Sequence, residues 1–346
     1  MSNEDVGIII NLNSNYSNYQ FDFRTFPVVL SILPFLYIIP TCFVTFRIIE
    51  VFIKKGVRKH DETINRSVFL VIILSQLTCF CYFFCDFMMV RLPSTGILTS
   101  WCQRNPPNLS LTIFFTSHMY FGYPLMIYPV LLAIVRYTPI HYPHKHHLLN
   151  TKILSFSIPI IHFYPFPFLF FMFPALGVCR QLKPPYPFGS AFIHFIESWH
   201  GVSSFKSSQN LQNRLKLQLI NAPFQMLNTS FWFVIYLVSN VYLHRELHKL
   251  SGTSPWHTNR STKYKKAEFS LSITTLTMVL TYLVNLVFQG TFLIDYQLAI
   301  YASFLRPYGN DLETCVMPWV FYLTHPAFRI KPGSNPSSST HRLNLT

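Results

Sequence analysis

Seven long apolar stretches separate the polar parts of the chain, and they restrict it to folds that cross a membrane. A helix rises about 1.5 Å per residue, so roughly 20 residues cross a hydrocarbon core of about 30 Å. Each stretch is long enough to do so. The stretches cover residues 26–53, 68–90, 111–135, 153–176, 222–243, 269–294 and 297–323. The expected fold is all-α, a polytopic membrane protein built as a seven-transmembrane helix bundle.

The composition agrees with burial in lipid. Half of the 346 residues are hydrophobic, only 12% are charged, and the mean hydropathy is +0.30, which is unusual for a soluble domain. In a soluble protein, the net charge of +14 would suggest nucleic acid as a partner. Here most lysines and arginines lie beside the apolar stretches, where anionic lipid headgroups attract them. We therefore expect membrane lipids as partners and no nucleic acid.

The basic residues also give the expected orientation. Of the 27 lysines and arginines, eighteen lie on one side of the apolar stretches, eight lie on the other, and Arg306 lies inside the seventh stretch. Cytoplasmic loops of membrane proteins carry the excess of basic residues. We therefore expect an extracellular N-terminus and a cytoplasmic C-terminus. Residues 1–25 would form the extracellular segment, residues 26–323 the membrane domain and residues 324–346 the cytoplasmic tail.

Two of the seven cysteines fall in loops that are expected outside the cell. Cys102 precedes the third apolar stretch and Cys179 follows the fourth. The exterior is oxidising, so a disulfide between them is chemically reasonable, and two unpaired thiols are the alternative. The cysteine spacing matches no metal-binding pattern, and we expect no metal and no cofactor. The sequons at Asn15 and Asn108 lie on the same side and are candidates for glycosylation.

The third apolar stretch ends in the motif Val135-Arg136-Tyr137. Here the chain resembles a G-protein-coupled receptor, whose third helix ends in an acidic residue, arginine and tyrosine. The resemblance implies that Arg136 and Tyr137 hold a lock in the resting state and contact the G protein when the bundle opens. Val135 occupies the acidic position, so a lock between Arg136 and its neighbour cannot form. The alternative is that Arg136 is an ordinary basic anchor at the cytoplasmic surface.

Three further motifs lie in the first stretch, after the fourth and in the seventh. They are Phe35-Leu36-Tyr37-Ile38-Ile39-Pro40-Thr41, Phe173-Pro174-Ala175-Leu176-Gly177-Val178-Cys179-Arg180, and Pro307-Tyr308-Gly309-Asn310-Asp311 with Pro318-Trp319. With them the chain resembles the nematode serpentine chemoreceptors, most closely class U of the class G superfamily. Rhodopsin-type receptors carry Asn-Pro-x-x-Tyr in the seventh helix. The resemblance therefore implies, in loose correspondence, switch roles for Asn310, Asp311, Pro318 and Tyr322.

Polar side chains inside the apolar stretches are the default candidates for a binding site, because their burial in lipid is costly. On the expected outer halves these candidates are Asp86, His118, Tyr120, Tyr123, Gln225, Asn228 and Gln289. Together with nearby aromatic residues they suit a small organic ligand. For Asp86 the alternative is a place at the lipid interface, and for Asp311 and Glu313 it is a purely structural role. Prolines in four of the stretches kink the helices and provide hinges.

These features predict a chemosensory G-protein-coupled receptor. A small-molecule odorant or pheromone would bind in the outer half of the bundle and activate a heterotrimeric G protein. The expected location is the plasma membrane, in the sensory cilium of a neuron. The alternatives are a G-protein-independent ligand-gated channel, against which the loop charges argue, and a transporter, for which the chain lacks duplicated halves. No catalytic motif indicates an enzyme.

Overall fold

The computed structural model describes residues 8–58, 65–170, 175–196, 211–253, 258–294 and 296–328. The expected cytoplasmic tail from residue 329 onward and the side chain of Gln289 lie outside the described residues.

The described chain is mostly helical. Its α-helices are α1 (Phe26–Val51), α2 (Arg66–Asp86), α3 (Leu92–Ser94), α4 (Thr99–Arg104), α5 (Leu109–His141), α6 (His146–Phe163), α7 (Phe166–Leu169), α8 (Leu211–Thr253), α9 (Thr258–Ile294) and α10 (Tyr296–Thr324). Two π-helical segments, η4 (Phe52–Arg58) and η5 (Phe87–Arg91), continue α1 and α2. The short 3-10 helices are η2 (Ile10–Leu12), η3 (Ser14–Tyr16) and η9 (Pro326–Phe328). The strands β1 (Leu176–Gln181) and β2 (Ala191–Ile196) pair antiparallel, an addition to the all-α expectation.

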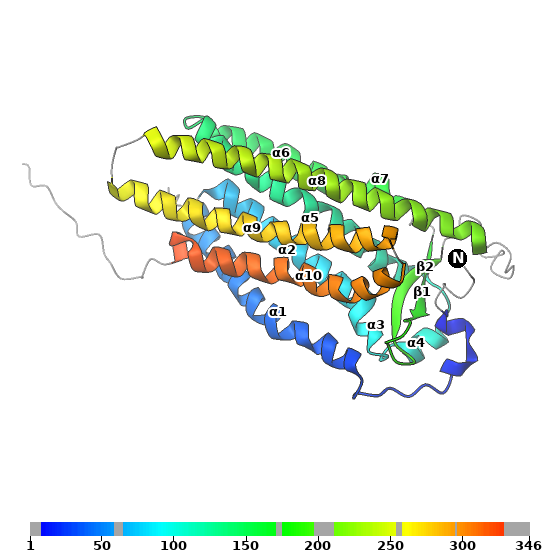
Figure 1. Ribbon diagram of the computed structural model, residues 1–346. Coiled ribbons are helices and arrows are strands. Elements are labelled where there is room, and N and C mark those ends of the chain that lie inside the picture. The colour runs from blue at the N-terminus through cyan, green and yellow to red at the C-terminus, as the bar shows by residue number, and fades with distance from the viewer. Residues whose placement is uncertain are drawn as a thin grey trace, which may run out of the picture.

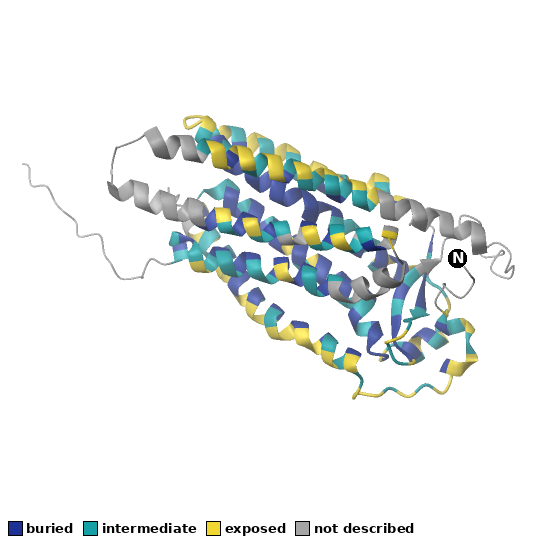
Figure 2. Ribbon diagram, in the orientation of Figure 1, coloured by how far each residue is buried: buried dark blue, intermediate teal, exposed yellow. Residues whose placement is uncertain are grey.

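The long helices lie side by side, and β1 and β2 cover one end of the bundle (Figure 1). We call this end the hairpin end and the opposite end the Arg136 end. Helix α5 is central, because it packs against α2, α6, α8 and α9. Figure 2 shows α5 mostly buried, whereas much of α1 is exposed. The exposed side chains of α1 are apolar, Phe43 at 68% and Phe46 at 69%, as expected for a face that contacts lipid.

Among the described residues, six helices are long and apolar enough to cross a membrane. Helix α10 is not one of them, and its middle carries Arg306, Asp311 and Glu313. It nevertheless lies within the bundle, packed against α9, α1 and α2. Gly309 permits the close contact with α9, because a Cβ atom there would lie 2.5 Å from Val284 Cγ1. Small residues serve this purpose between membrane helices. Helix α10 is the seventh expected helix, with its ionisable residues shielded by its neighbours.

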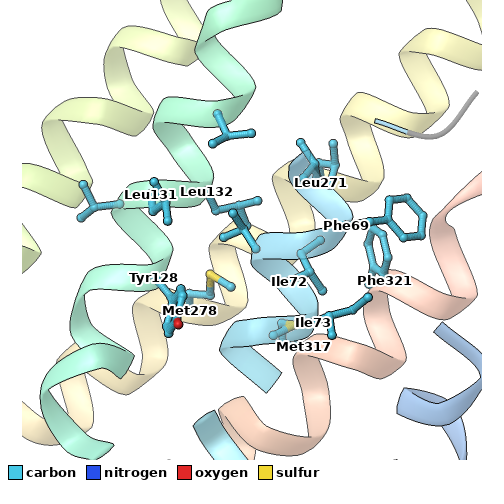
Figure 3. Close-up of a cluster of buried hydrophobic side chains, with 14 of the residues drawn as sticks. Phe69, Ile72, Ile73, Tyr128, Leu131, Leu132, Leu271, Met278, Met317 and Phe321 are labelled. Carbon is cyan, nitrogen blue, oxygen red and sulfur yellow. The ribbon is translucent and has the colours of Figure 1, made fainter. Parts of the chain in front are cut away.

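The largest group of buried apolar side chains joins α2, α5, α9 and α10 (Figure 3). Tyr128 and Leu132 of α5 and Phe321 of α10 are fully buried. Phe69 of α2 meets Phe321 edge to face, with ring centroids 5.0 Å apart. In lipid such a cluster stabilises the bundle through close van der Waals packing, because apolar burial alone gives little driving force there.

The expected fourth helix ends earlier than the sequence predicts. Helix α6 stops at Phe163, the short α7 follows, and the chain enters strand β1 at Leu176, so a helix through residue 176 is wrong. Pro165 and Pro167 explain this difference, because proline lacks the backbone N–H that a continuing helix requires. The fifth and sixth helices are longer than expected. Helix α8 continues to Thr253 and α9 begins at Thr258, so both extend into the stretch that was expected to be a loop.

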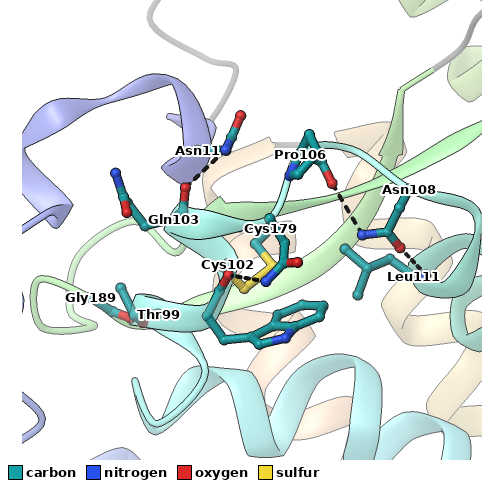
Figure 4. The surroundings of a disulfide bond; sticks show 11 residues. Asn11, Thr99, Cys102, Gln103, Pro106, Asn108, Leu111, Cys179 and Gly189 are labelled. Atoms are coloured by element: carbon teal, nitrogen blue, oxygen red, sulfur yellow. Dashed lines mark hydrogen bonds between the residues drawn. A yellow bond between two sulfur atoms is a disulfide. The ribbon is translucent and has the colours of Figure 1, made fainter.

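The hairpin is fastened to the bundle by a disulfide. Cys179 of β1 is bonded to Cys102 of α4, as Figure 4 shows. Beside it, Gly177 and Asn108 exchange two backbone hydrogen bonds of 3.0 and 3.1 Å. A Cβ atom at Gly177 would lie 2.5 Å from the backbone nitrogen of Thr112, so no larger residue fits without movement of α5. The hairpin therefore rests directly on the first turn of α5.

The N-terminal segment also packs on the hairpin. Ile9 forms a bridge with Arg180 of β1, and the side chains of Ile10 and Tyr16 are buried. Tyr16 donates a hydrogen bond of 3.2 Å to Gln181. Hairpin, α4 and N-terminal segment together form a folded cap over this end of the helices.

Candidate functional site

A pocket opens between α2, α5, α8, α9 and α10. The space between the lining side chains that is free of protein atoms measures about 570 Å³, a volume that includes solvent outside the pocket mouth. Four of the residues expected to contact a ligand line it: His118, Tyr123, Gln225 and Asn228. Asp86 and Tyr120 do not line it; Tyr120 instead donates to the backbone oxygen of His162 at 2.9 Å, which joins α5 to α6. Glu313, for which the sequence leaves a structural role as the alternative, also lines the pocket, and so does Arg306, which is not among the expected ligand contacts.

A chain of hydrogen bonds crosses the pocket wall and centres on the Tyr82 hydroxyl. Asn285 donates to Asn310 Oδ1 at 3.2 Å, and Asn310 donates to Tyr82 Oη at 3.0 Å. Arg306 donates to the same oxygen at 3.3 Å. These contacts join α2, α9 and α10. Asn310, which the resemblance places in the switch, is therefore part of the pocket wall.

His118 lies between the pocket and a second polar group. Its side chain is only 1% exposed and its ring lies 4.5 Å from that of Tyr82. Nδ1 is 3.9 Å from Asp86 Oδ1, too far for a hydrogen bond, and neither ring nitrogen has a hydrogen-bond partner among the described residues. A ligand that binds His118 would therefore lie one side chain away from Asp86.

Asp86 belongs to a buried ionic group, the Arg91 cluster, formed by Arg91, Asp86, Asp311 and Tyr37. Arg91 Nε binds Asp86 Oδ2 at 3.0 Å, while Nη1 and Nη2 bind the two oxygens of Asp311 at 2.7 and 2.9 Å. The Tyr37 hydroxyl donates to Asp311. The guanidinium carbon lies over the rings of Phe83 and Tyr308, 5.1 and 5.2 Å from their centroids. The cluster joins η5, α1 and α10 near the hairpin end.

Arg91 is one of the eight basic residues expected on the outer side, yet it is not a solvated loop residue: it ends the π-helical segment η5 and its side chain is 5% exposed. The alternative of an interfacial Asp86 is also wrong, because that residue is buried. The reason is the π-helical turn η5. In a π-helix, residues five apart occupy successive turns, and Asp86 and Arg91 have this spacing. A pattern based on 3.6 residues per turn does not detect it.

A second buried arginine lies near the opposite end of α5. Arg136 is 3% exposed. Its Nη1 donates to the carbonyl oxygen of Leu271 at 3.2 Å and to Thr275 Oγ1 at 3.3 Å, and its Nη2 donates to Ser272 Oγ at 3.2 Å. We call these bonds the Arg136 contacts. They join α5 to α9 through neutral oxygens, and Val135 is packed into the core. The burial contradicts the alternative of a surface anchor.

The remaining switch candidates are divided between the two ends. Tyr137 stacks on His141 and packs against Tyr242 of α8, with centroid distances of 5.4 Å in both pairs. Pro318 is buried and Tyr322 packs against Phe328, 5.0 Å between centroids. Asp311, by contrast, is bound to Arg91. The structure does not bring Asn310 and Asp311 together with Arg136.

The two glycosylation candidates differ in their surroundings. Asn15 is exposed, in the 3-10 helix η3. Asn108 caps the N-terminus of α5 by accepting from Leu111 N at 3.1 Å, and its Nδ2 donates to the carbonyl oxygen of Pro106 at 3.1 Å. A glycan replaces one hydrogen of that amide, so Asn15 is the more accessible acceptor.

Comparison with known proteins gives two matches. The family model of the serpentine-type seven-transmembrane G-protein-coupled chemoreceptors named Sru matches residues 10–331. Serpentine receptor class U-26 of Caenorhabditis elegans is 35% identical over 275 residues, which are 79% of this chain and 87% of that protein.

Proposed function

Because this chain belongs to the Sru family of serpentine chemoreceptors, which are multi-pass membrane receptors and not an enzyme family, we propose that it binds a small organic molecule in the pocket and activates a heterotrimeric G protein. The ligand would be an odorant or a pheromone. The receptor would act at the plasma membrane, in the sensory cilium of a neuron.

The observation that carries this proposal is the position of α5. One part of this helix lines the pocket through His118 and Tyr123, and another carries Arg136 with its contacts to α9. Both sites therefore lie on one continuous helix, Leu109–His141. A ligand that favours a different position of α5 would change the Arg136 contacts without any additional element.

The proposed orientation places the hairpin end outside the cell and the Arg136 end in the cytoplasm. Two observations support it. The loops at the Arg136 end carry most of the lysines and arginines, as cytoplasmic loops do. The Cys102–Cys179 disulfide lies at the hairpin end, and disulfides persist in the oxidising exterior.

Activation is then a shift between two arrangements of the helices. In the arrangement described here, the bonds of Arg136 to Leu271, Thr275 and Ser272 of α9 go to neutral acceptors, which water or a partner protein can replace at little cost. A ligand shifts the equilibrium only if it binds the open arrangement better. Helix α5 can bend at its internal prolines, Pro124, Pro129 and Pro139. Separation of α5 from α9 would expose Arg136 to the G protein.

Reconstituted receptor, a panel of G proteins and a library of volatile and pheromone-like compounds test the proposal. We expect ligand-dependent nucleotide exchange on at least one G protein. Arg136→Ala should reduce this exchange at equal surface expression, because the contact to the G protein is lost. A ligand-evoked ion current that persists without any G protein would refute the proposal in favour of a channel.

A further inference from the structure

We propose that the pocket selects small organic acids, whose carboxylate binds Arg306. This inference rests on the proposed ligand-binding function and names the chemical class of the ligand. The distribution of charges around the pocket supports it.

The buried charges near the pocket differ in their partners. Asp86 and Asp311 are both bound to Arg91. Arg306 forms no ion pair with any described residue; its contacts are the Tyr82 hydroxyl at 3.3 Å and the ring of Phe288, 4.5 Å from its centroid. A guanidinium has five N–H donors, and the buried Nε of Arg306 has no hydrogen-bond partner in the described part of the chain. Arg306 is thus a cation in the pocket wall whose one hydrogen-bond acceptor among the described residues is the Tyr82 hydroxyl.

A second hydrogen-bonding side chain lies close to Arg306. His118 lines the same pocket, and its nitrogens also have no hydrogen-bond partner among the described residues. Tyr82 brings the two together, because its ring lies against His118 and its hydroxyl accepts from Arg306. Unpaired buried polar groups cost free energy until a partner binds them. A carboxylate has two acceptor oxygens and is able to satisfy both side chains, whereas an amine adds a cation beside Arg306.

The positions of Arg306, Glu313 and the apolar lining determine how the ligand would be oriented in the pocket. Glu313 follows Arg306 by seven residues on α10, about 10 Å along the helix axis, and is 2% exposed. An acidic side chain offers a carboxylate no attraction, so the acid group is favoured at Arg306. The rest of the ligand lies against the apolar lining, which includes Met119, Leu125 and Met126. Recognition of the acid at one end and apolar contact along the body are typical of small-molecule sites.

Direct binding to purified full-length receptor in lipid nanodiscs tests this proposal without any G protein. The probes are two matched series: hexanoate, methyl hexanoate, hexanol and hexylamine, and phenylacetate, methyl phenylacetate, phenylethanol and phenethylamine. We expect at least one acid to raise the unfolding temperature and to bind about ten- to a hundredfold more tightly than its ester, alcohol or amine, the range for a hydrogen bond to a charged group.

Three variants identify the group responsible. Arg306→Gln should remove the preference for the acid, and Arg306→Lys should retain it at lower affinity, which distinguishes loss of charge from loss of folding. Glu313→Gln is the matched control and should retain or strengthen acid binding. The proposal is overturned if no acid binds wild-type receptor, if the preference survives Arg306→Gln, or if amines bind best and lose affinity in Glu313→Gln. Failure of G-protein activation alone would leave these binding results unchanged and would count only against the proposed function.

Discussion

Two buried arginines join helices near opposite ends of the bundle, and they use different partners to do so. Arg91 is bound by two carboxylates, one of them through both oxygens, and is enclosed by two aromatic rings. Arg136 is bound by a backbone carbonyl and two hydroxyls, each at 3.2 or 3.3 Å. The bonds of Arg91 are ionic and short, whereas these three bonds of Arg136 go to neutral oxygens and are longer.

The difference indicates that the helix contacts near the hairpin end are costly to break, whereas those near the Arg136 end can be exchanged for other partners. Breaking a buried ion pair leaves an uncompensated charge and costs about 3–5 kcal/mol. A neutral hydrogen bond contributes only about 0.5–1.5 kcal/mol, because water or another protein replaces it. We therefore expect the Arg91 cluster to persist in both resting and active arrangements. The Arg136 contacts are expected to break on activation.

Removal of the ionic partner at the hairpin end should have the largest effect. Arg91→Met leaves Asp86 and Asp311 buried without a counter-ion, and we expect a loss of about 3–5 kcal/mol of stability. The measurement is the unfolding temperature of detergent-purified receptor, together with the yield of folded protein. Arg91→Met combined with Asp86→Asn and Asp311→Asn removes the charges as well and should recover most of this loss. If the triple variant is as unstable as Arg91→Met, charge burial is not what the cluster contributes.

The hairpin end is also closed covalently, and opening this link should have the next largest effect. Cys102 and Cys179 are 77 residues apart in sequence, and disulfides that close loops of this size stabilise by about 2–4 kcal/mol. Cys102→Ser should lower the unfolding temperature of non-reduced receptor accordingly. Cys81→Ser, at an exposed free cysteine, is the control. Equal stability of the two variants would show that the hairpin is held by its packing on α5 alone.

At the Arg136 end we expect a dependence on pH through His325, just beyond α10. Burial lowers the pKa of His325 to about 4, and its Nδ1 accepts from the backbone N–H of Ala327 at 3.3 Å. An unfolded histidine has a pKa of about 6.5, so the unfolded state binds the proton more readily. The contribution of neutral His325 to the free energy of unfolding is fully present above about pH 6.5. It decreases as the pH falls toward 4, and about 2 kcal/mol of it is lost at pH 5. Unfolding curves of wild type and His325→Phe at pH 7 and 5 check this; an equal loss in both would contradict it.

Much of this comparison could be predicted from the sequence, but unequally at the two ends. The apolar stretches predict the long helices, and the motif at Arg136 predicts a functional arginine at the end of the third. The acceptors on α9 could not be predicted, because Ser272 and Thr275 are ordinary helical residues whose position depends on how α9 packs. Arg91 follows directly after the predicted second helix, and its burial could not be predicted, because it is the π-helical turn that directs its side chain inward. The pocket required the tertiary arrangement: Arg306 becomes a candidate only when Asp86 and Asp311 are seen to be occupied.

Removal of the side-chain acceptors of Arg136 on α9 should change stability least and ligand-independent activity most clearly. Ser272→Ala with Thr275→Val removes two of the acceptors of Arg136 and leaves Arg136 itself available to the G protein. We expect a loss of only about 1–2 kcal/mol, because the carbonyl of Leu271 remains. The resting arrangement loses these bonds and the active one does not, so the equilibrium shifts toward activity. Thr277→Val is the matched control, because Thr277 lies in the same helix and its hydroxyl donates to the carbonyl oxygen of Thr274, not to Arg136.

The most direct test is therefore the rate of nucleotide exchange on the coupled G protein, without ligand, for reconstituted wild type and the Ser272→Ala/Thr275→Val variant. If the Arg136 contacts hold α5 and α9 in the resting arrangement, the variant should exchange nucleotide roughly five to ten times faster than wild type, as expected for a shift of about 1–1.4 kcal/mol. The control Thr277→Val should match wild type. A variant whose ligand-independent exchange equals or falls below that of wild type, while its ligand response is intact, would contradict this account.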